Sequence, residues 1–477
     1  MAGLATALSL KDHPGEITIV ERDPAPPTID PRDAFEHWKR PGVPQLRHTH
    51  FFLARLHSIL RRHHPALLAE LAEVGVVPGT MDQLLPATQA AHYVESAGDR
   101  EMLHLWGRRA TVEYVLRRHV ERMGRVKFLH DTTIEDLAIA RDGDQLRVSG
   151  VTLRTAEGRQ LLAADTIVDA TGRRTRYADQ LRDAGAQIHT EALSSQCGYY
   201  CRHFVQTSSE PEPPRRGTGA SLDYLVYGIF FAEQNTFSIA LAVPELETEL
   251  LAKLRRPEGF DEVCDQIPAL RLWRSRSESM SRVMGGAELA NRWNHYGRRG
   301  AAHVLGYFPV GDSFMQTNPI YGRGCSSAFV QAQLLAETFA KTRDERARAV
   351  QYHRGAKRLL RPHFDFCVAA DRAFIARAKQ ARGDKVSFAD RMLSHIYEAA
   401  FLPALEESGW VAREWLRAQQ MCELAPPWVA LSVLLYALAR WPLRGFRRAP
   451  ALPASGPERS EMLRLCLPAS TRREDAS

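Results

Sequence analysis

The stretch around residue 310 restricts the fold of this 477-residue chain more than any other part of the sequence. An apolar strand over 305–310 is followed by an acidic residue, a loop and a helix. A helix N-terminus presents free N–H groups and the positive end of the helix dipole. The stretch therefore predicts an α/β protein whose loop binds a diphosphate and an electron-rich ring, the alternative being a strand–loop–helix with an incidental Asp. Its marker residues are Gly311, Asp312, Pro319, Gly322 and Gly324.

The first twenty residues predict a helix over 1–10 and a buried β-branched strand over 17–20, which ends at Glu21. Gly3 in this helix and Glu21 after the strand match the second half of a dinucleotide-binding fingerprint. In that motif a glycine packs the helix on the sheet and the acidic residue binds a ribose. Any short helix–strand pair of an α/β protein is the alternative explanation.

The complete fingerprint contains a preceding strand and two earlier glycines. We therefore expect Met1 to be an internal methionine of a longer natural protein, in which a β-branched strand and Gly-x-Gly come before it. We also expect the 477-residue form to bind a dinucleotide cofactor poorly.

A further buried strand over 166–170 ends in a turn that contains Asp169 and Gly172. Such a strand end can bring backbone close to a cofactor, because glycine adopts conformations that other residues avoid. An ordinary strand-to-loop turn is the alternative.

The remaining patterns predict a second, antiparallel sheet and a helical C-terminal region. Two helices over 51–74, the second opened by Pro65, and a helix over 111–123 precede an antiparallel meander. The stretch 197–243 alternates aromatic and apolar residues around a turn at 233–235. The predicted organisation is a discontinuous cofactor domain (1–50, 100–182, 300–345), a substrate domain (51–99, 183–299), a helical region (346–448) and a disordered tail (449–477).

Composition excludes several classes of function. The net charge of +7 comes from 63 basic and 56 acidic residues, without a basic run interleaved with aromatics, so nucleic-acid binding is not expected. The seven cysteines are scattered and form no CxxC pair, so we expect no metal site, no disulfide framework and a cytoplasmic location. The longest apolar run, 428–439, is too short for a transmembrane helix.

The three patterns occur in the same order and at similar separations as in flavoprotein monooxygenases, so that residues 1–340 resemble the family of para-hydroxybenzoate hydroxylase. The resemblance implies an FAD/NAD(P)-binding, Rossmann-like three-layer fold. It implies that Glu21 binds the adenosine ribose, Asp312 the ribityl chain, and 322–324 the pyrophosphate or flavin edge. The other cofactor-binding residues that it implies are Gly3, Arg22, Arg47, Arg109, Asp169, Gly172, Gly311 and Pro319.

Within this resemblance, the turn 169–172 lies near FAD and docks a nicotinamide. His48 and His50 belong to the loop 42–50, and they either face the flavin or are hydrogen-bonded loop histidines. A Trp-x-Trp-x-Ile-Pro motif typical of halogenases is absent from the sequence, and so is a second GxGxxG.

The activity implied by the resemblance is insertion of oxygen into a small apolar or aromatic molecule, by hydroxylation or epoxidation, through a flavin hydroperoxide. Molecular oxygen is the co-substrate, and electrons come from NAD(P)H or a reductase partner. The aromatic residues of the second sheet either line the substrate site or belong to the hydrophobic core. No catalytic acid or base is identified. The alternatives are an FAD-dependent reductase of a prenyl-like lipid and a non-catalytic relic of the fold that binds a hydrophobic ligand.

Residues 425–448 combine an apolar helix with a following basic segment. This pattern suits a helix that lies on an anionic membrane surface, and the alternative is a helix packed on the protein body.

Overall fold

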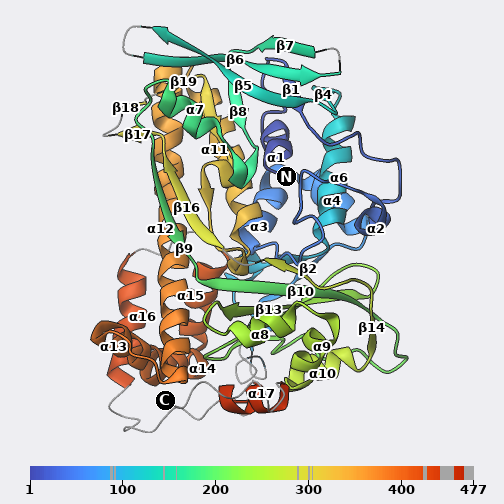
Figure 1. Cartoon of the computed structure of the whole chain (residues 1–477), viewed down its shortest axis with the longest axis vertical. Helices are drawn as coiled ribbons and strands as arrows, with labels where there is room; N and C mark the ends of the chain where they lie inside the picture. The colour runs from blue at the N-terminus through green and yellow to red at the C-terminus, as the bar shows by residue number, and fades with distance from the viewer. Residues whose placement is uncertain are drawn as a thin grey trace.

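The computed structural model describes residues 1–85, 90, 93–142, 145–156, 158–286, 289–298, 301–302, 304–422, 427–440 and 456–466. A β-meander lies at one end of the molecule, and a second sheet crosses the molecule further down (Figure 1). The long helix α12 (Glu345–Arg382) runs along one side. The predicted α/β class, the second antiparallel sheet and the helical C-terminal region are confirmed.

In the described part of the chain, strands pair in parallel at three places, and two of these are separate two-stranded sheets. Strand β1 (Ile17–Val20) pairs with β4 (Val126–Leu129), and β8 (Ile167–Asp169) pairs with β20 (Tyr307–Pro309). The predicted strand over 305–310 is interrupted at Gly306, which has φ +69° and leaves no room for a side chain beside the Val148 carbonyl. The part before the break, β19 (304–305), pairs instead with the meander.

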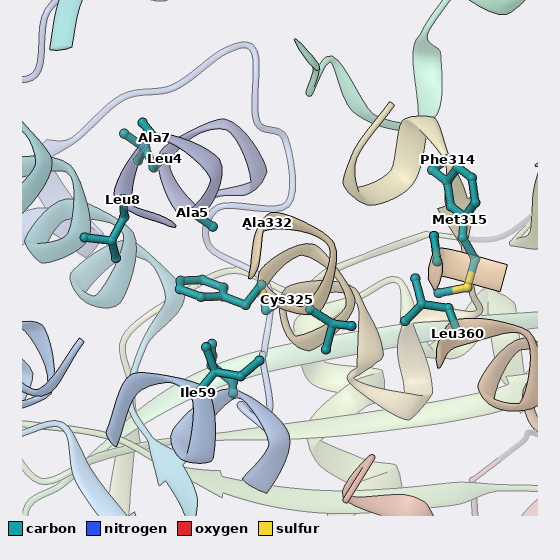
Figure 2. Close-up of a cluster of buried hydrophobic side chains, with 14 of the residues drawn as sticks. Leu4, Ala5, Ala7, Leu8, Ile59, Phe314, Met315, Cys325, Ala332 and Leu360 are labelled. Atoms are coloured by element: carbon teal, nitrogen blue, oxygen red, sulfur yellow. The ribbon is translucent and has the colours of Figure 1, made fainter. Parts of the chain in front are cut away.

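Helices cover these strands and form the first core. Helix α1 (Ala2–Ser9) packs on α11 (Arg323–Lys341), which contributes Cys325 and Ala332 beside Leu4 and Leu8 (Figure 2). The other helices of this region are α2 (Ala34–His37), α3 (Ala54–His63), α4 (Pro65–Glu73), α6 (Arg109–Arg122) and α7 (Tyr177–Asp183).

Helices α3 and α4 lie in the stretch 51–99 that we expect in the substrate domain. Their Leu56, Ile59 and Leu67 are buried in the same core as α1, which also contains Trp293 of the stretch 183–299. Helix α3 packs against α11, and helix α4 packs against α6.

The meander consists of β5 (Thr133–Asp142), β6 (Gln145–Thr155) and β7 (Gly158–Ala163). The remaining short strands form three small sheets, in which β2 pairs with β3, β17 with β18, and β16 with both β9 and β21. The strands are β2 (Val77–Gly79), β3 (His104–Trp106), β9 (His189–Ser194), β16 (Ala290–His295), β17 (Gly297–Arg298), β18 (Ala301–Ala302) and β21 (Met315–Gln316).

The second sheet has the order β11-β12-β13-β10-β14, and β15 also pairs with β10. The predicted turn over 233–235 joins β12 to β13, and both Gln234 and Asn235 have positive φ there. Most of the aromatic stripe is core, including Phe204, Tyr224 and Phe237. The bounds are β10 (Cys197–Gln206), β11 (Gly219–Ser221), β12 (Val226–Phe231), β13 (Thr236–Pro244), β14 (Ser277–Ser279), β15 (Met284–Gly286), α8 (Thr248–Leu254), α9 (Pro257–Asp265) and α10 (Pro268–Arg274).

The prediction of a disordered tail over 449–477 is wrong for its middle part. Residues Arg459–Cys466 form helix α17, which buries Met462 and Cys466 against the second sheet. The preceding helices are α13 (Phe388–Ile396), α14 (Leu402–Glu407), α15 (Gly409–Gln419) and α16 (Pro427–Arg440). Among the described residues, no helix is long and apolar enough to cross a membrane.

Candidate functional site

The loop that follows β20 brings an acidic side chain to the start of α11. Gly311 has φ +66°, and its N–H donates to Gln331 Oε1 at 2.7 Å. A Cβ at Gly311 would lie 3.0 Å from that of Ala2, so glycine allows this turn to approach α1. Asp312 therefore lies between the beginnings of α1 and α11.

The start of α11 faces this carboxylate. A short 3₁₀ turn over Pro319–Tyr321 leads into Gly322, whose φ of +65° reverses the chain before Arg323 begins the helix. A Cβ at Gly324 would lie 3.9 Å from Asp312 Oδ1. The first free N–H groups of α11 thus lie near Asp312, as the sequence predicts.

Asp312 has an uncommitted carboxylate. Among the described residues, no donor forms a hydrogen bond with its side chain, whereas Asp169 accepts several. Burial raises the pKa of Asp312, and the guanidinium groups of Arg109 and Arg173 act in the opposite direction. The guanidinium of Arg173 also makes no hydrogen bond to the part of the chain that the structure describes.

Arg109, at the start of α6, connects the site to the loop 42–50. Its Nε donates to Glu113 Oε2 at 3.0 Å, and its Nη1 donates to His50 Nε2 at 2.9 Å. His50 in turn donates from Nδ1 to the His48 carbonyl. Burial, with Arg109 adding to it, lowers the pKa of His50, so the ring is neutral and accepts from Arg109.

His48 contacts the second sheet through Tyr199 on β10, with which its Nδ1 shares a hydrogen bond. Burial, together with the charges of Arg109 and Arg173, lowers the pKa of His48 to about 4. Both histidines are thus hydrogen-bonded, and both lie beside Arg109. The sequence pattern did not indicate Tyr199 as anything but a member of the aromatic stripe.

Glu21, the predicted ribose ligand, is engaged by an arginine that the sequence analysis did not identify. The Arg40 guanidinium contacts Glu21, donates to Asp23 Oδ2 at 3.1 Å and donates to Glu113 Oε1 at 2.7 Å. Burial raises the pKa of Glu113, but neighbouring positive charges, among them Arg109 and Arg40, outweigh it and hold this pKa well below its usual range. Glu113 therefore keeps its charge in the core of the site.

Two other predicted arginines are committed to backbone carbonyls. The guanidinium of Arg47 binds the carbonyl oxygens of Phe35, Glu36 and Trp38, at the end of α2. Arg22 is exposed and donates to the Gly42 carbonyl at 2.9 Å. Both arginines therefore fix the loop 42–50 through these hydrogen bonds. Neither side chain donates a hydrogen bond to Asp312.

Asp169 and Gly172 form a rigid turn at the end of β8. The buried Asp169 carboxylate accepts from the Thr171 N–H, the Thr171 and Thr175 hydroxyls and the Tyr307 hydroxyl, at 2.6 to 2.9 Å. Gly172 has φ +82°, with open space around it. Gly3 lies against this turn, since its Cβ would be 3.4 Å from that of Ala170.

This donor set fits FAD. A helix N-terminus behind Gly322 and the free guanidinium of Arg173 suit phosphate oxygens. The uncommitted carboxylate of Asp312 suits the hydroxyl groups of a ribityl chain. No group of three or more potential metal ligands occurs among the described residues.

The fold is one that flavin-dependent halogenases and monooxygenases of known structure share, so the predicted resemblance is confirmed at the level of the fold. The flavin-dependent brominase Bmp2 superposes with a TM-score of 0.60 at 14% identity, over 93% of this chain and 97% of its own. The FAD-dependent monooxygenase PqsL from Pseudomonas aeruginosa superposes with a TM-score of 0.54 at 17% identity, over 79% and 92%.

A hydroxylase shares the fold as well: the anhydrotetracycline hydroxylase OxyS from Streptomyces rimosus superposes with a TM-score of 0.55 at 14% identity, over 89% of this chain and 75% of its own. Among curated proteins, Protein Rv3254 of Mycobacterium tuberculosis is 27% identical over 354 residues, which are 70% of this chain and 69% of that protein. No protein-family model matches the sequence.

Proposed function

We propose that this chain is an FAD-dependent monooxygenase that inserts oxygen into a small apolar or aromatic molecule. The observation that carries the proposal is the half-buried Asp312 carboxylate, which has no hydrogen-bond donor among the described residues and faces the first turn of α11. A carboxylate without a partner is costly to bury, so this position suits a residue that receives its donors from a ligand.

FAD, when bound, would supply the redox chemistry with oxygen, with electrons from NAD(P)H or a reductase partner. Asp312 would hold the ribityl hydroxyls, and the first N–H groups of α11 with Arg173 would hold phosphate oxygens. Arg40 already contacts the Glu21 carboxylate. Glu21 would therefore bind the adenosine ribose with Arg40 as its neighbour.

The substrate class rests on the side chains next to the loop that ends in Gly322. Phe51, whose carbonyl oxygen would be 3.1 Å from a Cβ at Gly322, lies 5.8 Å from Phe230 of the second sheet between ring centroids. Tyr199 lies on the same sheet and contacts His48. These three aromatic side chains are half-buried, unlike the rest of the stripe, and favour an apolar or aromatic substrate.

The first test is Asp312→Ala, measured by titration of the purified protein with FAD. Loss of a charge-assisted hydrogen bond costs about 1.5–3 kcal/mol, so the Kd for FAD should rise roughly ten- to a hundredfold. Asp183→Ala, at an exposed position on α7, is the matched control and should leave the Kd unchanged. An unchanged Kd in Asp312→Ala contradicts the assignment.

Asp169→Asn is expected to weaken FAD binding less than Asp312→Ala does. Its carboxylate is already saturated by the turn and by Tyr307, so its replacement should instead lower thermal stability. A thermal melt separates the two effects.

Oxygen consumption separates a monooxygenase from a lipid reductase with the same cofactor. Substrate-dependent oxygen uptake with NAD(P)H supports the proposal, whereas substrate turnover without oxygen supports the reductase. A protein that binds a hydrophobic ligand but turns it over neither with nor without oxygen supports a non-catalytic relic of the fold.

A further inference from the structure

A cavity of about 360 Å³ lies between α12, the segment that leads into α13, and the turn from β9 to β10. Its volume is in the range of small-molecule sites. The lining residues on which the argument depends are Val368, Asp371, Ile375, Lys379, Lys385 and Val386.

The rim of this cavity carries uncommitted positive charge. Arg372 pairs with Asp390, its Nε lying 3.0 Å from Asp390 Oδ1. Lys379 and Lys385 have no ion-pair partner within 4.0 Å in the described part of the chain, although Lys379 is near enough to lower the pKa of Asp390 slightly, after Ser387 and Arg372. Two ammonium groups thus border one opening.

The inner end of the cavity is polar but saturated. Asp371 is 4% exposed and accepts from Asn291 Nδ2 at 2.6 Å, from Asn318 Nδ2 at 2.8 Å and from the Tyr321 hydroxyl at 2.8 Å. These three donors leave little capacity for another one. Apolar side chains also line the cavity, among them Val368, Ile375 and Val386, and the turn from β9 to β10 adds polar residues.

We propose that this cavity is a second ligand site, which binds a small monocarboxylate with an apolar body. The carboxylate lies between Lys379 and Lys385, and the apolar body lies against Val368, Ile375 and Val386. A cationic ligand is disfavoured by the same two ammonium groups. A neutral ligand would leave the two ammonium groups without a counter-charge.

The site does not depend on the proposed flavin chemistry, so binding is measured directly. Octanoate is the probe, and isothermal titration calorimetry on the full chain is the measurement. Octan-1-ol and octylamine keep the apolar body but replace the charge. We expect octanoate to bind at least about tenfold more tightly than either, because a charge-assisted contact is absent from both.

Two variants locate the binding. Lys379→Ala/Lys385→Ala removes both ammonium groups and should weaken octanoate binding by about tenfold or more. Val386→Trp fills the cavity from a half-buried loop position and should abolish it. Lys341→Ala, at a side chain that is 70% exposed on α11, is the control and should bind as the parent does.

The proposal is overturned if the double variant binds octanoate as tightly as the parent, because the probe then binds elsewhere. It is equally overturned if octan-1-ol binds as tightly as octanoate, or if octanoate does not bind. Circular dichroism and a thermal melt identify a variant that fails to fold. Lys379→Gln/Lys385→Gln, which keeps the length of the side chains better, then replaces the alanine pair, with the same expected loss.

Discussion

Gly172 and Gly322 both have positive φ beside the candidate flavin site, but their surroundings differ. A Cβ at Gly322 would lie 3.1 Å from the Phe51 carbonyl oxygen, whereas a Cβ at Gly172 would meet nothing within 4 Å. An L-residue in the left-handed region costs about 1–2 kcal/mol. Gly172→Ala should therefore show this cost alone, measured as the free energy of unfolding.

Gly322→Ala should cost more than Gly172→Ala, because the Phe51 backbone must also move. The same movement shifts the first turn of α11, so we expect the Kd for FAD to rise in Gly322→Ala and to change little in Gly172→Ala. Equal unfolding free energies in the two variants would show that the Phe51 contact has no energetic weight.

Single residues also show which features of the candidate site can be predicted from the sequence and which cannot. The turn at Gly311 and the place of Asp312 directly after a strand could be predicted, because they depend on local chain geometry. Arg40 could not, since its contacts with Glu21, Asp23 and Glu113 arise only when distant segments fold together. Arg47 lies in the loop 42–50, where the resemblance implies a cofactor-binding residue. In the structure its guanidinium instead donates to backbone carbonyl groups at the end of α2.

The hairpin between β12 and β13 is attached to the start of α6 by a buried ion pair. Arg108 Nε lies 2.7 Å from Glu233 Oε1, with side chains 1% and 0% exposed, and the Arg108 N–H donates to the other carboxylate oxygen at 3.0 Å. Removing one partner of a buried pair leaves an uncompensated charge and costs about 3–5 kcal/mol.

We therefore expect Glu233→Gln to lower the free energy of unfolding by about 3 kcal/mol in denaturant titrations. The control is Glu210→Gln, whose 63% exposed side chain pairs with Arg276 and whose loss should cost about 0–1 kcal/mol. A cost for Glu233→Gln as small as that of the control would mean that the pair adds nothing to the connection between the two cores.

Helix α16 has an exposed apolar stripe, formed by Leu431, Leu434 and Leu435, which are 54%, 42% and 56% exposed. The basic segment 441–448 that completes the predicted membrane contact lies outside the described residues. We predict that Leu431→Ser/Leu434→Ser/Leu435→Ser reduces flotation with phosphatidylserine vesicles several-fold, because apolar area drives such binding. If the variant floats as well as the parent chain does, α16 does not bind the vesicles, and it is instead a helix packed on the protein body.

Deletion of residues 425–477 is a poorer test of the same idea, because it also removes α17. Met462 of that helix is fully buried, and Arg459 pairs with Glu247 at 2.7 Å. Proline, serine and charge in the tail predicted disorder, but three well-placed contacts are enough to order a short helix on an existing apolar surface. Composition averages over a segment and misses such contacts.

Across the whole molecule, buried histidines make folding sensitive to acid. His104 is fully buried, and burial, with a small contribution from His57, lowers its pKa to about 3. The unfolded chain binds this proton near pH 6.5, so stability is present above that pH and is lost as the pH falls towards the folded pKa. Burial also lowers the pKa of His203 and His363 to about 3, with the same sign.

His104→Phe removes one such group in a position already packed against Phe51 and Trp106, with ring centroids 4.9 Å and 4.3 Å away. Between pH 7 and pH 5 the parent chain should lose about 2 kcal/mol more stability than the variant, as measured by denaturant titration at both pH values. His63→Phe, at an exposed position, is the control and should keep the pH dependence of the parent. An unchanged dependence in His104→Phe would show that this ring is protonated in the folded state.

Helix α12 extends through 38 residues from the meander to the second sheet. Its Leu360 and Phe364 belong to the first core, while Phe374 and Ile375 pack with Cys197 of β10. Pro362 lies on its exposed face, so the carbonyl that loses a hydrogen bond there faces water. Because one continuous helix packs on the first core and on the start of β10, opening at one of these contacts while the other stays closed would bend or break that helix. Amide hydrogens at the two ends of α12 should consequently exchange with solvent at one common rate under conditions that favour global opening.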